Sequence, residues 1–98
     1  MVEVPEKINI NELYPNRHVQ LRIIQEAYYL GDEVILGFDL IDFPPVEIIY
    51  IEWQYSKDEI EWFPVENEHG ETFSFIVDET NSKFWYRVMV NLNYLLFD

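Results

Sequence analysis

The sequence contains no cysteine and only three glycines. Without cysteine there are no disulfide bonds and no thiolate metal sites, so packing alone must stabilise the core. The few glycines form no phosphate-binding loop, and no serine or threonine lies in a nucleophile-elbow motif. No apolar run reaches the roughly 18 residues of a membrane span. The N-terminal MVEVPE lacks the basic and apolar regions of a signal peptide, which favours synthesis in the cytosol or a module cut from a longer secreted protein.

Basic residues are also scarce. Six lysines and arginines stand against 19 acidic residues, and the formal net charge is −13. Direct binding to nucleic-acid phosphates requires a basic patch, so this balance disfavours it. An acidic surface can meet a basic partner, attract cations or keep a protein soluble, and solubility is the favoured interpretation.

Aromatic and β-branched residues are plentiful, and hydrophobic residues make up 49% of the 98-residue chain. This composition predicts one folded domain. The segment 47–56 reads EIIYIEWQYS and alternates with a period of two. One side carries Ile49, Ile51, Trp53 and Tyr55, while Tyr50, Glu52 and Gln54 lie on the other. We predict a central strand in which Trp53 anchors two packed sheets.

The remaining chain divides into an N-terminal arm, residues 1–17, and a β-sandwich domain, residues 18–98. The arm is predicted to be extended, with a short turn at residues 11–13, and to pack on its own domain or on a neighbour. Turn residues and prolines separate further short strands. Their predicted ranges are 18–25, 34–40, 60–63, 72–77, 84–90 and, after a turn at 91–93, 94–97. About seven antiparallel strands predict an all-β sandwich.

Several short motifs follow one another along the chain. They are WQYSKD at 53–58, Trp62, TFSF at 72–75, Asn81 and YRVMV at 86–90. In the order and spacing of these motifs, residues 30–91 resemble bacterial and phage immunoglobulin-like modules, and fibronectin type III domains are a close rival. The resemblance implies an immunoglobulin-like sandwich with Trp53 packed between the sheets.

The same resemblance assigns places to other residues. Leu36 or Phe38 and Tyr86 would occupy the positions of the disulfide cysteines of antibody domains. Phe84 lies near the place of the tyrosine corner but has no hydroxyl. Glu59 and Ile60 replace the usual glycine-rich turn.

Outward aromatic residues are the main candidate binding residues. Tyr50 and Trp85 alternate with inward residues, and Trp62 lies on a predicted edge strand. Such side chains can anchor a protein contact or stack on sugar rings, or they can be covered by the arm or a neighbouring domain. Of these three interpretations, we favour aromatic side chains that are covered by the arm or a neighbouring domain. A protein interface is the second, and a platform for sugar rings is the third.

Acidic residues cluster after the central strand. Their outward or loop positions favour a solvated face over a glycosidase pair, which needs one buried carboxyl group. We predict neither catalysis nor a cofactor. The turn at 78–82 is interpreted as structural rather than as a calcium site, and His18 and His69 as surface residues. The acidic surface comprises Glu52, Glu59, Glu61, Glu66 and Glu68.

These observations predict a non-enzymatic structural or adhesive module. It would dock to a larger protein assembly or to neighbouring immunoglobulin-like domains through its arm and one outward aromatic face. The expected location is a phage virion assembled in the host cytoplasm, or a bacterial cell surface. Two alternatives remain: a carbohydrate-binding module using Tyr50, Trp62 or Trp85, and an acidic DNA mimic that inhibits a basic protein. Direct nucleic-acid binding and membrane insertion are not expected.

Overall fold

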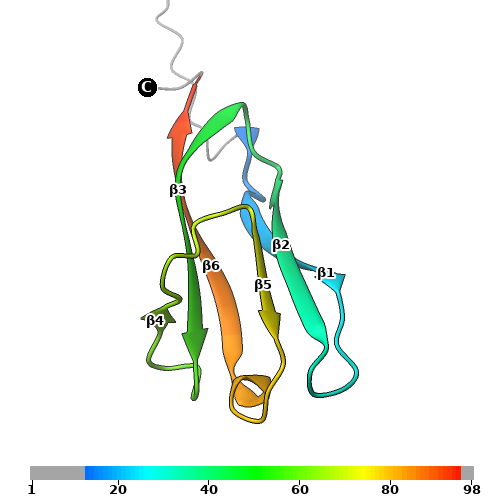
Figure 1. Ribbon diagram of the computed structural model, residues 1–98. Helices are drawn as coiled ribbons and strands as arrows, with labels where there is room; N and C mark the ends of the chain where they lie inside the picture. The colour runs from blue at the N-terminus through cyan, green and yellow to red at the C-terminus, as the bar shows by residue number, and fades with distance from the viewer. Residues whose placement is uncertain (1–12, 96–98) are drawn as a thin grey trace, which may run out of the picture.

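The computed structural model describes residues 13–95, which form two antiparallel three-stranded sheets (Figure 1). One sheet has the order β1-β2-β5, with β1 at His18–Gln25, β2 at Glu33–Ile41 and β5 at Thr72–Ile76. The other has the order β4-β3-β6, with β4 at Phe63–Pro64, β3 at Val46–Ser56 and β6 at Trp85–Tyr94. A 3₁₀ turn, η1 at Asn81–Lys83, precedes β6. The predicted all-β class is confirmed.

The core consists of residues contributed by both sheets. Leu36 and Phe73 come from one sheet and Ile51 and Trp53 from the other, and all four are buried. Trp53 is fully buried, with its ring centroid 5.6 Å from that of Phe73 and 6.2 Å from that of Phe38. Its indole Nε1 donates a hydrogen bond of 2.8 Å to the Gly70 carbonyl. The structure therefore confirms Trp53 as the anchor between the sheets.

A bulge in β3 corrects one predicted core residue. The pairing with β6 shifts between Ile48 and Tyr50, which leaves Ile49 as an extra residue. Ile49 is exposed, whereas Ile48 packs against the core. Because each added residue in a strand reverses the sides of the following ones, the predicted alternation holds only from Tyr50 onward.

The end of the chain also differs from the prediction. Strand β6 continues through the predicted turn at 91–93 and includes Tyr94, so no separate strand begins there. Val88 and Val90 pack against the core, and Leu92 keeps the same phase while the asparagines at 91 and 93 are exposed. Periodic apolar residues outweighed the turn preference of asparagine here. Residues 13–95 contain six strands rather than about seven, while 96–98 and residues 1–12 of the arm lie outside the described residues.

The predicted strand at 60–63 is mostly a loop, because only Phe63 and Pro64 pair with β3. Two side chains organise this loop. The Ser56 hydroxyl oxygen accepts hydrogen bonds from the backbone N–H groups of Asp58 and Glu59. The Asp58 carboxylate accepts bonds from the N–H groups of Ile60 and Glu61, and these bonds hold its pKa below the usual value. Local side-chain bonding thus competes with strand pairing.

Among residues 13–95, no helix is long and apolar enough to span a membrane.

Glu59 occupies the left-handed region of backbone space, with φ at 64°. A non-glycine residue in this conformation destabilises the folded state by about 1–2 kcal/mol, and glycine would relieve that strain. Glycine also increases the conformational entropy of the unfolded chain, which offsets part of the stabilisation. We expect Glu59→Gly to raise the free energy of unfolding by as much as about 1 kcal/mol, measured by urea denaturation. Glu61→Gly is the control, since its φ is not positive. A loss of stability in Glu59→Gly would contradict the strain argument.

Candidate functional site

The outer face of the β3–β6 sheet carries the aromatic residues singled out in the sequence. The register places Tyr50 opposite Asn91, Glu52 opposite Met89, Gln54 opposite Arg87 and Ser56 opposite Trp85. Apart from Ser56, which is fully buried, these side chains lie on the side of the sheet that faces away from the core. We call this side the outer stripe and define it by Tyr50, Glu52, Gln54, Trp85, Arg87 and Met89, with Trp62 lying on it.

Trp62 is held on the outer stripe by a chain of polar contacts. The guanidinium of Arg87 lies 4.3 Å from the centroid of the Trp62 ring, a cation–π arrangement. Arg87 Nε donates a hydrogen bond of 2.7 Å to Gln54 Oε1. Trp62 is partly buried. The sequence placed it on an edge strand, whereas the structure places it on a loop that folds back over the sheet.

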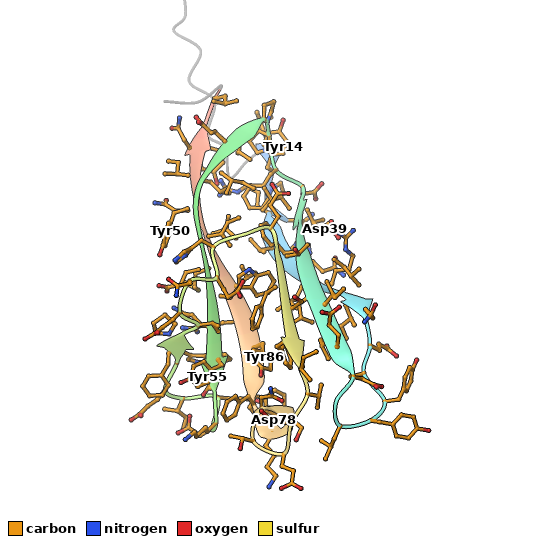
Figure 2. All side chains as sticks on the ribbon, viewed as in Figure 1. Tyr14, Asp39, Tyr50, Tyr55, Asp78 and Tyr86 are labelled. Carbon is orange, nitrogen blue, oxygen red and sulfur yellow. The ribbon has the colours of Figure 1, made fainter. Side chains whose placement is uncertain are left out.

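Tyr50 and Trp85 are exposed, as their alternation predicted, with 47% and 54% of their surface accessible. Figure 2 shows Tyr50 pointing away from the sandwich. Its ring lies 5.0 Å from that of His69, whose Nδ1 is 2.9 Å from the Ile51 carbonyl oxygen. About six residues of strand, or roughly 20 Å, separate Tyr50 from Trp85. The three aromatic candidates therefore share one face but do not converge on a common pocket.

The acidic candidates spread over the outer stripe and the adjoining loops. Glu52 lies on the stripe and accepts a hydrogen bond of 2.6 Å from Gln54 Nε2. Glu59 and Glu61 belong to the loop before β4, and Glu66 and Glu68 to the loop before β5. Within residues 13–95, no three histidine, aspartate or glutamate side chains gather closely enough to hold a metal ion.

A second exposed surface was not predicted. Tyr28, Tyr29 and Leu30 form the turn between β1 and β2, which we call the tip, and their exposed fractions are 76%, 77% and 59%. Gly31, with φ at 94°, reverses the chain and donates its N–H to the Val77 carbonyl. Asp32 Oδ2 accepts bonds of 3.1 Å from the N–H groups of both tyrosines. Three bulky apolar residues beside a Gly-Asp turn are the sequence signal that could have revealed the tip.

The tyrosine hydroxyl nearest β1 is also bonded. Tyr28 donates a hydrogen bond of 3.0 Å to Glu26 Oε2, and this bond together with the negative charge raises the pKa of Tyr28. The bonds to Asp32 constrain the backbone of the tip, while the rings of both tyrosines face solvent.

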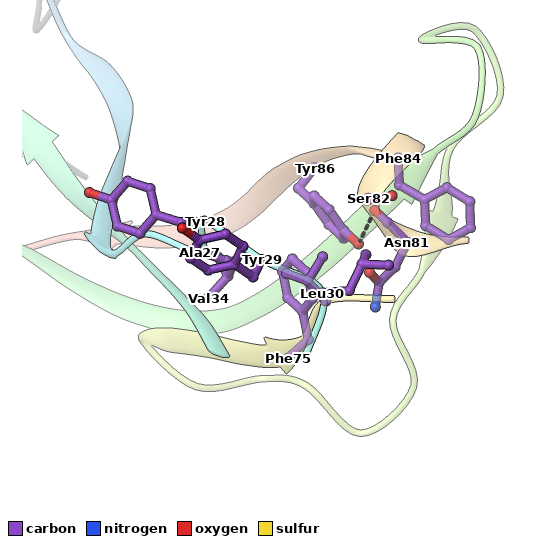
Figure 3. Close-up of a pocket in the computed structure, with 11 residues that line it drawn as sticks. Ala27, Tyr28, Tyr29, Leu30, Val34, Phe75, Asn81, Ser82, Phe84 and Tyr86 are labelled. Carbon is purple, nitrogen blue, oxygen red and sulfur yellow. Dashed lines mark hydrogen bonds between the residues drawn. The ribbon is translucent and has the colours of Figure 1, made fainter. Parts of the chain in front are cut away.

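A hollow of about 420 Å³ lies between the tip, the C-terminal end of β5 and the N-terminal end of β6 (Figure 3). Its apolar walls include Leu30, Phe75, Phe84 and Tyr86. Tyr86 donates its hydroxyl to the Asn81 carbonyl oxygen at 3.3 Å. Burial, with the nearby charge of Asp78, raises the pKa of Tyr86 to about 12. The lining also includes Tyr28, Tyr29, Asn81 and Ser82, so the hollow combines apolar rings with neutral phenol, amide and hydroxyl groups. Such a lining suits a neutral side chain better than a charged ligand.

Comparison with known proteins gives no identification. No family model matches the chain, and no curated protein or solved structure matches it.

Proposed function

We propose that the chain is a non-enzymatic immunoglobulin-like module that acts by docking to other proteins of a larger assembly. The assembly would be a phage virion or a bacterial cell surface, and neighbouring immunoglobulin-like domains are possible partners. The docking surfaces would be the tip and the outer stripe.

The strand order supports an immunoglobulin-like module. Antibody constant domains pair their first, second and fifth strands in one sheet and their third and sixth strands in the other. Here β1-β2-β5 and β3-β6 have the same associations. The bond from the Tyr86 hydroxyl to the backbone five residues upstream also resembles a tyrosine corner. On this interpretation Tyr86, rather than Phe84, would fill that role.

The observation that carries the docking proposal is an exposed aromatic tip whose backbone is bonded to Asp32. Tyrosine supplies a large contact area with few rotatable bonds, and interface hot spots are rich in it. The bonds to Asp32 order the tip before any partner arrives, so association need not order it. The adjoining hollow, lined by rings and by neutral polar groups, offers a receptor for a neutral side chain of the partner.

Co-sedimentation tests the proposal directly. Virion and envelope fractions would be purified from the organism that encodes the chain, and tagged protein would be added to each. We expect one fraction to retain the chain. Tyr28→Ser combined with Tyr29→Ser should weaken retention by about 30-fold or more, since a hot spot contributes about 2 kcal/mol or more.

The matched control is Tyr28→Phe, which keeps the ring and removes only the bond to Glu26. Retention should change little in this variant. If neither fraction retains the chain, the docking proposal is wrong. If the double variant binds as well as the parent, the tip is not the docking surface, and Trp85→Ala then tests the outer stripe.

A carbohydrate-binding role is the second candidate, because aromatic side chains lie along the broad face of the outer stripe. Trp85 is its most exposed ring, whereas Trp62 is stacked against Arg87 and Tyr50 against His69. A glycan array would decide between the two functions. Binding lost on Trp85→Ala but retained in the tip variant would favour the sugar.

A further inference from the structure

Strand β1 leaves one side of the sandwich open. Its residues Val19, Leu21 and Ile23 pair with Leu40, Phe38 and Leu36 of β2. Directly paired residues of antiparallel strands point to the same face, so these three side chains point toward the opposite sheet. Their exposed fractions are nevertheless 36%, 36% and 58%. The opposite sheet does not extend far enough to cover them.

The strand nearest to this open side is β6. One edge of β6 pairs with β3, and no strand among residues 13–95 pairs with the other edge. Strands β1 and β6 approach each other across the two layers. An additional strand on β6 would therefore satisfy its unpaired N–H and C=O groups and cover the apolar residues of β1.

We propose that residues 2–10 of the same chain form this seventh strand. The segment reads VEVPEKINI, and its apolar residues Val2, Val4, Ile8 and Ile10 all occupy even positions. An extended chain places them on one face, toward β1, together with Glu6, and puts Glu3, Lys7 and Asn9 on the other face. Nine residues span about 30 Å, close to the length of β6. Pro5 is compatible, because an edge strand tolerates a residue without an N–H group.

The start of the described chain shows where such a strand would enter. Arg17 Nη1 donates a hydrogen bond of 3.0 Å to the Tyr94 hydroxyl, and its guanidinium lies 5.6 Å from the centroid of that ring. A turn at Pro15 and Asn16 precedes this contact. The Ile10 end of the segment would thus lie at the C-terminal end of β6, and the segment would run parallel to β6.

Two arguments favour the chain's own segment over that of a second copy. The link at 11–17 is short, and a short tether gives an effective concentration in the millimolar range. Two copies that each carry a net charge of −13 repel one another.

A disulfide experiment on the full chain tests the pairing, and the absence of native cysteine makes it clean. Met89 is an exposed, outward residue of β6. We expect Lys7→Cys or Asn9→Cys, combined with Met89→Cys, to form a disulfide within one chain under mild oxidation. The phase control is Glu6→Cys with Met89→Cys, which should cross-link at least about tenfold less because alternate residues face opposite sides. Mass spectrometry after non-reducing digestion identifies each product.

Equal yields in both phases would show that the segment is not a strand on β6 and would overturn the proposal. Disulfides formed only between chains would overturn it in favour of a second copy.

Hydrogen exchange gives an independent measurement. Those N–H groups of β6 that do not bond to β3 should exchange at least about tenfold faster in full-length Ile8→Asn combined with Ile10→Asn than in the parent. The control, Lys7→Gln with Asn9→Gln, changes only the polar face and should leave the exchange unaltered. Equal exchange in the parent and the asparagine variant would overturn the proposal. Neither experiment depends on docking.

Discussion

Trp53→Ala is expected to lower the free energy of unfolding by about 3–5 kcal/mol, the largest effect of any change considered. The side chain is fully buried between the sheets and contacts Phe38 and Phe73. Its removal leaves a cavity and also leaves the Gly70 carbonyl without its donor. Domains of this size have about 5–15 kcal/mol of stability in total, so the variant should be close to unfolding at 37 °C. Urea denaturation monitored by circular dichroism measures the change.

Trp53→Phe is the matched control. It keeps most of the buried ring and removes the indole N–H, so we expect a smaller loss. A loss below about 1 kcal/mol in the alanine variant would mean that Trp53 does not anchor the sheets.

Tyr86→Ala should have the second largest effect, a loss of about 3 kcal/mol in the free energy of unfolding. The ring of Tyr86 lies among three phenylalanine rings, with centroid distances of 4.8 Å to Phe75, 5.9 Å to Phe73 and 6.4 Å to Phe84. Alanine would remove these contacts and merge the hollow beside the tip with the space left by the ring. Thermal and urea unfolding both measure the loss.

Tyr86→Phe separates packing from the hydroxyl group, and we expect it to lower the free energy of unfolding by no more than about 1.5 kcal/mol.

The same variant should also change how stability depends on pH. The ordinary tyrosine pKa is 10.0, and that of Tyr86 in the folded protein is about 12. Between these values the unfolded chain has lost a proton that the folded chain retains, so stability falls as the pH rises from 10 to 12. The phenylalanine variant should lack this part of the alkaline loss. Identical pH profiles would contradict the raised pKa.

The central strand could be predicted from the sequence because one side of it is in the core and the other is not. From Tyr50 onward the alternation identified Ile51 and Trp53 as core residues. The strand predicted at 72–77 contains Phe73, which is in the core, and Phe75, which packs against it. Each of these positions is decided by burial, the strongest signal in a sequence of this kind.

The errors arose where local bonding or an extra residue altered the pattern. Nothing in the sequence distinguishes the bulged Ile49 from its neighbour Ile48. The loop before β4 replaced a strand because Ser56 and Asp58 bond to the backbone. Asparagine at 91 and 93 suggested a turn, although outward positions of a strand accept polar residues equally well.

The candidate site could be predicted only in part. The exposure of Tyr50 and Trp85 followed from alternation. The contact between the Arg87 guanidinium and the Trp62 ring, however, depends on a loop whose path only the structure gives. The tip was missed because residues 26–33 were predicted only as the connection between the strands at 18–25 and 34–40. The bonds from the backbone N–H groups of Tyr28 and Tyr29 to the Asp32 carboxylate, which define the turn of the tip, are known only from the structure.

The bulge in β3 determines where the length of this chain can change. The inserted residue divides the strand into two parts whose side chains follow opposite parity. A one-residue deletion before Ile48 would turn over only the short stretch from Val46. Deletion of Ile51 would turn Trp53 out of the core and bring Glu52 into it. Relatives of this protein should therefore vary in length before the bulge and keep a constant spacing from Tyr50 to Ser56.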